Sequence, residues 1–347
     1  MDDHYSYFKR ARRNVSHFSG SNQMRIAVVG AGMTGAYLYK LLVAKGHSVD
    51  VFDRNPGTRC GLTPCAWGTS RGFAELVKAS GLDPSRYILK SPDHVIIDGL
   101  KIGADVMTID KQMLIRDLLR DVDVSHSRPN AEGYDRVIDA TGVSRAFLPS
   151  IKDDFILPCV QFRVRSDGPL ENQIKLGRIG YAWCFPLADH EYHIGCGSFI
   201  SDPRTILKEL GWMGNDASRG KIVCACTGTV RLAGPQSSQP FVADGADHEI
   251  WGVGEAIGCV APLAGDGIIP GMRSAQILME HWDDPSGYTK AILREFRWMQ
   301  GERRVIDKLR RNEAFGLSDA WVLKKNSRRM AIDVGLKEAA MLLKHLR

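Results

Sequence analysis

The sequence predicts an α/β protein in which a parallel-sheet domain is interleaved with an antiparallel-sheet domain and followed by a helical C-terminal region. Three observations support this prediction. A strand–helix–strand pattern opens the fold, extended segments of alternating polarity fill the middle, and helical spacing dominates the end. The chain has 347 residues and is 44% hydrophobic, so it can bury a large core.

The first unit is a strand, a helix and a second strand. Residues 25–29 (RIAVV) form a short apolar run rich in β-branched residues, which is typical of a buried parallel strand. Helical spacing follows over 36–45, and 48–53 (SVDVFD) is the next expected strand. Residues 54–68 are rich in Gly and Pro, which predicts a loop.

The remaining elements follow from the same patterns. Residues 94–103 predict a hairpin that turns at Asp98-Gly99, and 136–139 predict another apolar strand. From about 159 to 199 the alternation predicts an antiparallel sheet. We further expect helices over 70–80, 111–120, 203–210 and 271–282, strands over 221–232 and 249–256, and mainly helix over 286–347.

This order predicts discontinuous domains. We expect a flexible extension over 1–23, a nucleotide-binding domain over 24–72, 105–155 and 245–285, a substrate-binding β-sheet domain over 73–104 and 156–244, and a basic helical region over 286–347.

Composition excludes several classes of function. The eight cysteines are scattered, no paired CxxC zinc site is present, and no metal is expected. No run approaches the roughly 18 consecutive apolar residues of a membrane-spanning helix, and the first 23 residues lack the apolar core of a secretory signal. We therefore expect a cytoplasmic protein with reduced thiols.

Charge is concentrated at the C-terminus. The net charge is +6, and residues 294–347 hold fourteen Lys or Arg against seven Asp or Glu. These helices either present a solvated basic face or meet an anionic surface, such as phospholipid headgroups at the inner face of the cell membrane. Nucleic acid is not an expected partner, because no nucleic-acid-binding module accompanies the charge.

A glycine motif indicates nucleotide binding. Gly30, Gly32 and Gly35 form GxGxxG between the first strand and its helix, and Asp53 ends the next strand. The glycines permit a tight turn, the approach of a pyrophosphate and close helix packing, while Asp53 can accept a hydrogen bond from the adenosine ribose.

Two later segments favour FAD over NAD. YDRVIDATG (134–142) ends a strand where the backbone must pass close to a nucleotide. IWGVGEAIGCVAPLAGDGIIPGMRSAQ (250–276) adds Glu255, which can bind ribityl hydroxyls, and a loop and helix end that can face the flavin. An NAD domain has no need of this last element.

With these motifs, the chain resembles the para-hydroxybenzoate-hydroxylase-type flavoproteins and, among them, the geranylgeranyl reductases. Thr63-Pro64-Cys65 stands at the family's Lys-Pro-Cys-Gly segment. Residues 181–186 (YAWCFP) match its Tyr-x-Trp-x-Phe-Pro motif, and 261–268 (APLAGDGI) parallel its Asn-Pro-Leu-Thr-Gly-Gly-Gly-Ile loop. The resemblance covers about residues 24–282.

The chain departs from the family pattern at several positions. Glu255 replaces an Asp, Lys111 replaces an Arg at the pyrophosphate, Ala66-Trp67 follow the Cys, and Asp266 enters an otherwise all-glycine loop. Residues 122–139 look shortened.

The resemblance implies a fold in which an FAD-binding Rossmann-like domain of the GR2 type is interleaved with a substrate sheet. Together with the motifs it nominates Cys65, Tyr181, Trp183 and Phe185 as catalytic residues. The cofactor-binding candidates are Gly30, Ala31, Gly32, Thr34, Gly35, Asp53, Arg54, Cys65, Ala66, Lys111, Ala140, Thr141, Gly142, Gly254, Glu255, Pro262, Gly265, Asp266, Gly267 and Ile268.

Individual residues keep alternative interpretations. Cys65 is a packing residue, a proton donor or the redox partner of Cys60. The aromatic residues at 181, 183 and 185 share one strand face, as sheet core or as a wall that guides an isoprenoid chain. Asp266 tunes the flavin or caps the helix that begins at 268. His190 and His193 are expected at the surface or in a turn.

The implied reaction is reduction of carbon–carbon double bonds of a polyprenyl lipid of the geranylgeranyl type, by hydride from N5 of the reduced flavin. The electron donor is expected to be NAD(P)H or ferredoxin, because no second GxGxxG is present. Two alternatives stay open: a flavin-dependent monooxygenase or halogenase of the same superfamily, and a non-catalytic lipid-binding protein.

Overall fold

The computed structural model describes residues 23–54, 65–130, 132–177, 180–199, 201–213, 220–245 and 248–345. The predicted extension before residue 23 lies outside these residues, as do Cys60, Thr63 and Pro64 of the predicted loop.

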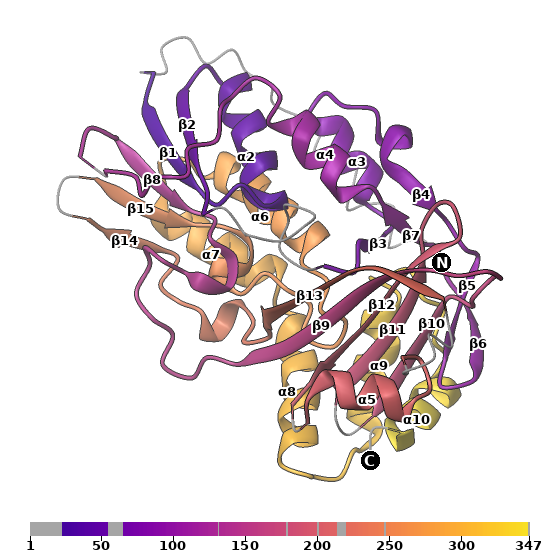
Figure 1. The fold of residues 1–347 in the computed structure, drawn as a ribbon. Helices are drawn as coiled ribbons and strands as arrows, with labels where there is room; N and C mark the ends of the chain where they lie inside the picture. Colours follow the sequence, from indigo (N-terminus) through magenta and orange to yellow (C-terminus); the bar gives the residue numbers. More distant parts are fainter. Residues whose placement is uncertain are drawn as a thin grey trace.

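A five-stranded sheet forms the nucleotide-binding half of the molecule (Figure 1). Its strands lie in the order β14 (Val242–Asp244), β15 (Glu249–Gly252), β8 (Arg136–Asp139), β1 (Arg25–Val29) and β2 (Ser48–Phe52). All neighbours are parallel except β14 and β15. The four parallel strands therefore end at one edge of the sheet, where ligands of such sheets bind.

Helices pack on one face of this sheet, since alternate residues of β1 face opposite sides. Ile26 and Val28 enter the main core, while Ala27 and Val29 pack on the other face with Phe52. The main core also contains residues of α2 (Met33–Ala44), α3 (Phe73–Ala79), α4 (Lys111–Leu118), α6 (Ile268–Glu280) and α7 (Pro285–Glu295). Helix α2 starts three residues before the predicted 36, because Gly32 is its N-cap.

The second half is built on a seven-stranded sheet. The order is β13 (Lys221–Arg231), β9 (Ile156–Arg165), β12 (Glu191–Ser198), β11 (Gly180–Pro186), β10 (Gln173–Gly177), β5 (His94–Ile97) and β6 (Leu100–Gly103). All neighbours are antiparallel except β10 and β5. The predicted hairpin is confirmed, with Asp98 and Gly99 both at positive φ.

A small sheet lies between the two halves. It contains β3 (Gly68–Ser70), β7 (Val106–Ile109) and β4 (Ile88–Lys90), with β7 in the middle. The hydroxyl of Thr108 donates to the carbonyl of Pro186 at 2.6 Å, which ties this sheet to β11. In the predicted segment 73–104, only β5 and β6 join the large antiparallel sheet, whereas α3 packs with α6.

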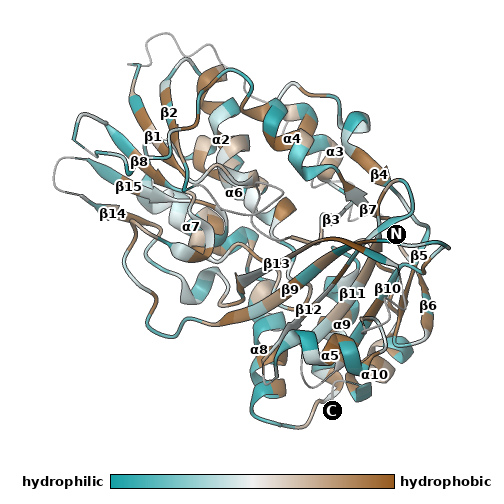
Figure 2. Ribbon diagram, viewed as in Figure 1, coloured by the Kyte–Doolittle hydropathy of each residue, from teal (hydrophilic) through white to brown (hydrophobic). Residues whose placement is uncertain are grey.

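Different helices pack on the two faces of the antiparallel sheet. Helix α5 (Pro203–Glu209) packs on the face of Ala182 and Cys184. Tyr181 and Trp183 face the other way, and their cross-strand partners Leu176 and Ile174 pack towards the C-terminal helices. Those helices are α8 (Met299–Arg310), α9 (Leu317–Ser327) and α10 (Leu336–His345), and Figure 2 shows hydrophobic and hydrophilic residues interleaved along them.

Two predictions need correction. The predicted strand 249–256 ends at Gly252, and a short 3-10 helix (Gly254–Ile257) follows, since Gly254 adopts φ +65°. His193 was expected at the surface or in a turn, but it lies within β12 and is only 3% exposed. Burial lowers the pKa of His193 to about 4, and its Nδ1 lies 3.2 Å from the carbonyl oxygen of Ala66.

Candidate functional site

The three glycines of the turn after β1 differ in what a side chain at each position would meet. Gly30 has φ +108°, and a Cβ there would lie 2.2 Å from the carbonyl oxygen of Ala140. A Cβ on Gly35 would lie 1.8 Å from the carbonyl oxygen of Gly30. At Gly32, by contrast, an added Cβ would meet nothing within 4 Å. Gly30 and Gly35 are therefore required by the fold, whereas Gly32 borders open space.

The N-terminus of α2 suits an anion in that space. Its N-cap is Gly32, whose missing side chain leaves the first helical amides without a side-chain cap. Gly30 to Thr34 all line one large cavity. The positive end of the helix dipole and these amides can hold a pyrophosphate, so the residues fit a dinucleotide.

Asp53 lies where the sequence predicts it, at the end of β2. Its Oδ2 accepts a hydrogen bond from the amide of Ala31 at 3.0 Å, which fixes the glycine turn. Burial raises the pKa of Asp53, and the amide hydrogen bonds of Ala31 and Arg54 oppose this. Both Asp53 and Arg54 line the cavity, next to the space bordered by Gly32.

The end of β8 is organised by Asp139, which the sequence analysis did not single out. This fully buried carboxylate accepts from the amide and hydroxyl of Thr141 at 3.1 and 2.6 Å. It also accepts from the amides of Phe147 and Leu148 at 2.9 and 3.0 Å. The predicted residues Ala140, Thr141 and Gly142 line the cavity in consequence. An acid directly before Ala-Thr-Gly was a signal for this role.

Glu255 belongs to a buried network between β8, β13 and the 3-10 helix. Its Oε1 accepts from the amide of Arg231 at 2.7 Å, and a Cβ on Gly142 would lie 3.1 Å from Oε2. Burial raises the pKa of Glu255. The Arg231 side chain pairs with Asp154 at 2.9 Å and donates to the carbonyl of Val143 at 2.8 Å. The sequence alone gave no indication of Arg231 or Asp154.

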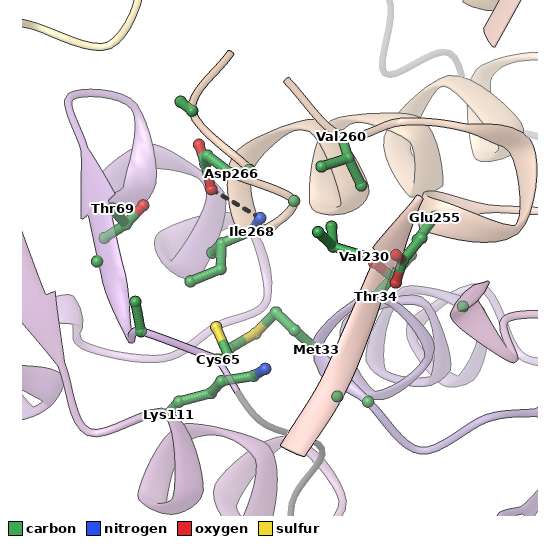
Figure 3. A pocket seen from close by; sticks show the side chains of 18 of the residues that line it. Met33, Thr34, Cys65, Thr69, Lys111, Val230, Glu255, Val260, Asp266 and Ile268 are labelled. Carbon is green, nitrogen blue, oxygen red and sulfur yellow. Dashed lines mark hydrogen bonds between the residues drawn. The ribbon is translucent and has the colours of Figure 1, made fainter. Parts of the chain in front are cut away.

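The loop before α6 is held by its own backbone. The amide of Gly265 donates to the carbonyl of Ala261 at 2.8 Å, and the amide of Ala261 donates to that of Asp266 at 2.9 Å. Oδ1 of Asp266 accepts from the amide of Ile268 at 2.9 Å, so the capping interpretation is correct (Figure 3). Burial raises the pKa of Asp266 to about 6.

Most predicted cofactor residues meet at this cavity. Cys65, Ala66, Lys111, Glu255 and residues 264–268 all line it, and Figure 3 shows Cys65 and Lys111 across from Asp266 and Ile268. Gly35, Gly254 and Pro262 lie outside its lining.

The three predicted aromatic residues form one wall of the cavity. The Tyr181 and Trp183 rings are 5.5 Å apart, and Phe185 packs against Gly68. A Cβ on Gly195 would lie 2.2 Å from the Trp183 ring, so the indole covers the neighbouring strand at that glycine. Burial raises the pKa of Tyr181 well above its ordinary value.

Gln161 connects this wall to Cys65. Its Oε1 accepts from Nε1 of Trp183 at 3.3 Å, and its Nε2 donates to the carbonyl of Cys65 at 2.9 Å. The indole is therefore held in place from β9, and the segment at Cys65 is held to the same side chain. The pairing of Cys65 with Cys60 falls outside the described residues.

The cavity continues into an apolar arm between the antiparallel sheet and the C-terminal helices. Its lining there is largely aliphatic: Val95, Ile97, Ile174, Leu176, Leu263, Leu323, Met330, Ile332, Val334 and Leu342. The whole cavity measures about 1170 Å³. Pockets for drug-sized molecules measure about 300–1,000 Å³, so this one has room for more than one small ligand.

One further carboxyl group lines the cavity. Glu302 of α8 is 2% exposed, and its Oε2 accepts from the amide of Leu263 at 3.1 Å. Burial raises the pKa of Glu302 to about 7. No sequence pattern singles out this residue, which stands in a strongly charged segment.

Sequence comparison supports the nucleotide-binding half. A family model described as an NAD(P)-binding Rossmann-like domain matches residues 28–62. An uncharacterized protein of Methanocaldococcus jannaschii, MJ1182, is 26% identical over 309 aligned residues, which cover 74% of this chain and 82% of the relative. In the described residues, no helix is long and apolar enough to cross a membrane.

Solved structures with the same fold cover nearly the whole chain. A geranylgeranyl bacteriochlorophyll reductase-like protein from Thermoplasma acidophilum has a TM-score of 0.64 at 16% identity, covering 93% of this chain and 100% of that protein. A tryptophan 6-halogenase from Streptomyces toxytricini has a TM-score of 0.62 at 13% identity, covering 93% and 90%. A probable FAD-dependent monooxygenase from Pseudomonas aeruginosa has a TM-score of 0.58 at 14% identity, covering 87% and 100%.

The predicted fold and the predicted resemblance are thus confirmed: the chain has the fold of the flavin-dependent oxidoreductases, which it shares with a geranylgeranyl reductase-like protein, monooxygenases and halogenases.

Proposed function

We propose that this protein binds FAD and reduces carbon–carbon double bonds of a long isoprenoid lipid of the geranylgeranyl type. The observation that supports this most is the continuity of the cavity. One end is lined by the glycine turn, Asp53 and Glu255, and the other by the aliphatic arm. A nucleotide and an apolar chain can therefore meet inside a single cavity.

The open space at Gly32 supports FAD as the nucleotide. The pyrophosphate would lie on the N-terminus of α2, the adenosine ribose at Asp53, and the ribityl chain near Glu255. The isoalloxazine would face the loop 264–267 and the start of α6. A domain that binds only NAD has no use for the last two elements.

The aliphatic arm supports a long apolar substrate. Its walls come from β5, β10 and the C-terminal helices, and polar side chains are few among them: Asn172, Glu302, Asn326 and Ser327. Such a surface selects by shape and by removal of apolar area from water. The Trp183 ring, held by Gln161, would exclude water where the arm meets the nucleotide end.

Reduced FAD would supply the hydride, and the chain must supply the matching proton. An isolated trisubstituted alkene accepts hydride only when a proton arrives at its other carbon. Glu302 and Asp266 both line the cavity with raised pKa values, so each can hold a proton nearer to neutral pH than an exposed carboxyl group. Cys65, with its place beside the nucleotide end, is a third candidate donor. The electron donor would be NAD(P)H or ferredoxin.

The test uses purified, flavin-loaded protein reduced with dithionite without oxygen, then mixed with a geranylgeranyl lipid. Mass spectrometry should show two added hydrogens per reduced bond, and both should be deuterium when the flavin is reduced in D₂O, because dithionite supplies only electrons and the N5 hydrogen of reduced flavin exchanges with solvent. No reduction across several prenyl lipids would overturn the proposal. An oxygen-dependent hydroxylated or halogenated product would identify a monooxygenase or halogenase, and a colourless protein with bound lipid would identify a lipid-binding protein.

A further inference from the structure

Helix α9 has two faces with opposite surroundings. Leu323, Asn326 and Ser327 line the cavity. On the other side, Leu317 is 88% exposed and Trp321 is 55% exposed, the largest fractions among the large hydrophobic side chains of the described residues. Positions 317 and 321 are one helical turn apart, so the two side chains form a single apolar ridge.

Basic side chains flank this ridge. Lys324, Lys325 and Arg328 follow Trp321 on the same side of α9 at 100° per residue, and Lys325 and Arg328 are exposed. The Lys324 ammonium lies 5.3 Å from the centre of the Trp321 ring. The acid of this helix, Asp319, is buried and pairs with Lys308 at 2.7 Å. The exposed face therefore combines apolar and cationic groups without a carboxylate.

Helix α10 packs against α9 and has an exposed face of the same kind. Leu336 is 46% exposed, and Lys337 and Lys344 of the same helix are also exposed. Figure 1 shows α9 and α10 together at the C-terminal end of the molecule, away from the parallel sheet.

We propose that the exposed face of α9 docks on a lipid bilayer that contains anionic headgroups. Trp at the headgroup level, a Leu directed into the acyl region and Lys or Arg at the phosphates are the pattern of an interfacial helix. The charge of the face complements that surface. A helix is only about 10–12 Å wide, so docking would bring the aliphatic arm within that distance of the bilayer. The docking proposal stands independently of the proposed reaction.

The experiment measures co-sedimentation of the full-length protein with vesicles. One set is pure phosphatidylcholine, and the other is an equal mixture of phosphatidylcholine and phosphatidylglycerol. Each basic side chain near an anionic surface strengthens binding by about fivefold, so Lys325→Glu with Arg328→Glu should weaken binding by at least about 25-fold. Binding should also fall as salt rises above about 0.15 M, where exposed charges are screened within about 8 Å.

A matched control reverses two exposed lysines on the nucleotide-binding half, Lys45→Glu and Lys78→Glu, and should bind like wild type. Arg329 is avoided because its guanidinium stacks on Trp298 at 5.5 Å. Trp321→Phe should retain vesicle binding but lose most of the fluorescence quenching by brominated phosphatidylcholine, since Trp67, Trp183, Trp212 and Trp251 are buried and Trp282 and Trp298 are half-buried.

Three outcomes would overturn the proposal. In the first, wild type binds neither kind of vesicle. In the second, it binds both kinds equally. In the third, the control variant loses as much binding as the α9 variant. A change of oligomeric state in Trp321→Ala with unchanged vesicle binding would instead identify this face as a protein contact. Thermal melts of all variants separate these outcomes from loss of folding.

Discussion

Replacing Glu302 with glutamine removes a carboxyl group that the fold buries against the amide of Leu263. Burial raises its pKa from the ordinary 4.5 to about 7, which means that the folded state holds this proton more tightly than the unfolded chain does. The stabilisation from that proton is complete below about pH 4.5 and is lost as the pH rises through about 7. At alkaline pH the buried charge of Glu302 therefore lowers the stability of wild type, whereas Glu302→Gln carries no such charge.

The magnitude follows from the pKa difference. The values 7 and 4.5 differ by about 2.5, and at about 1.36 kcal/mol per pH unit this corresponds to about 3 kcal/mol of unfolding free energy. Unfolding entropies near about 2.1 cal/mol/K per residue convert this into a melting-temperature difference of roughly 4 °C for a chain of 347 residues. Glutamine can still accept the Leu263 amide, so little else should change.

The assay is a series of thermal melts of wild type and Glu302→Gln from about pH 5 to about pH 8. The variant should gain on wild type progressively over this range, whereas Glu209→Gln, an exposed carboxylate on α5, should follow wild type throughout. Parallel curves for wild type and Glu302→Gln would refute the raised pKa. A variant that is less stable at every pH would show that the carboxylate itself supports the fold.

Activity provides a separate readout of the same variant. If Glu302 is the proton donor, lipid reduction by wild type should decline as the pH rises through about 7, because the donor loses its proton. Glu302→Gln should then fold, bind FAD and reduce lipid far more slowly. Unchanged turnover in the variant would assign the proton to another group, such as Asp266 or Cys65.

Further predictions concern the two ends of the cavity. Gly32→Val should fold but lack flavin absorbance, because its side chain occupies the space for the pyrophosphate, whereas Gly30→Val should fail to fold, since its Cβ would lie 2.2 Å from the Ala140 carbonyl oxygen. Flavin-loaded Gly32→Val would contradict this assignment. Asp139→Ala leaves four donors without their acceptor and should cost more than about 3 kcal/mol in urea unfolding; a near-neutral effect would mean that the loop finds other partners. Trp183→Ala should cost about 3–5 kcal/mol, as for a buried aromatic residue, and Trp183→Phe should keep fold and flavin content while slowing lipid reduction; equal turnover of Trp183→Phe and wild type would remove the indole from the substrate wall.

The local pattern of the sequence determined the parallel sheet and its glycine turn. Residues 25–29, 48–52, 136–139 and 249–252 are short apolar runs, and each became a strand of the same sheet. The hairpin at Asp98-Gly99 could also be predicted from the sequence, since that dipeptide tolerates positive φ. Because parallel strands end at one edge, Gly30, Asp53 and Ala140 were also expected to meet there, and all three line the cavity.

The alternation of YAWCFP was likewise sufficient to place Tyr181, Trp183 and Phe185 on one face. The alternation could not show which elements of the structure pack on that face. The C-terminal helices supply it, and they close the aliphatic arm with residues such as Leu323 and Leu342. In the sequence these helices were notable only for their basic charge.

Only the tertiary structure decided which polar groups are buried. Arg231, Glu302 and His193 stand among polar or extended residues whose local pattern is compatible with an exposed position. Their burial arises because surfaces far apart in the chain meet: α8 against the loop before α6, the end of β13 against β8, and β12 against the segment at Trp67. Periodicity reports which side of an element is apolar, but the burial of a single charged group depends on what packs against it, and so does its pKa.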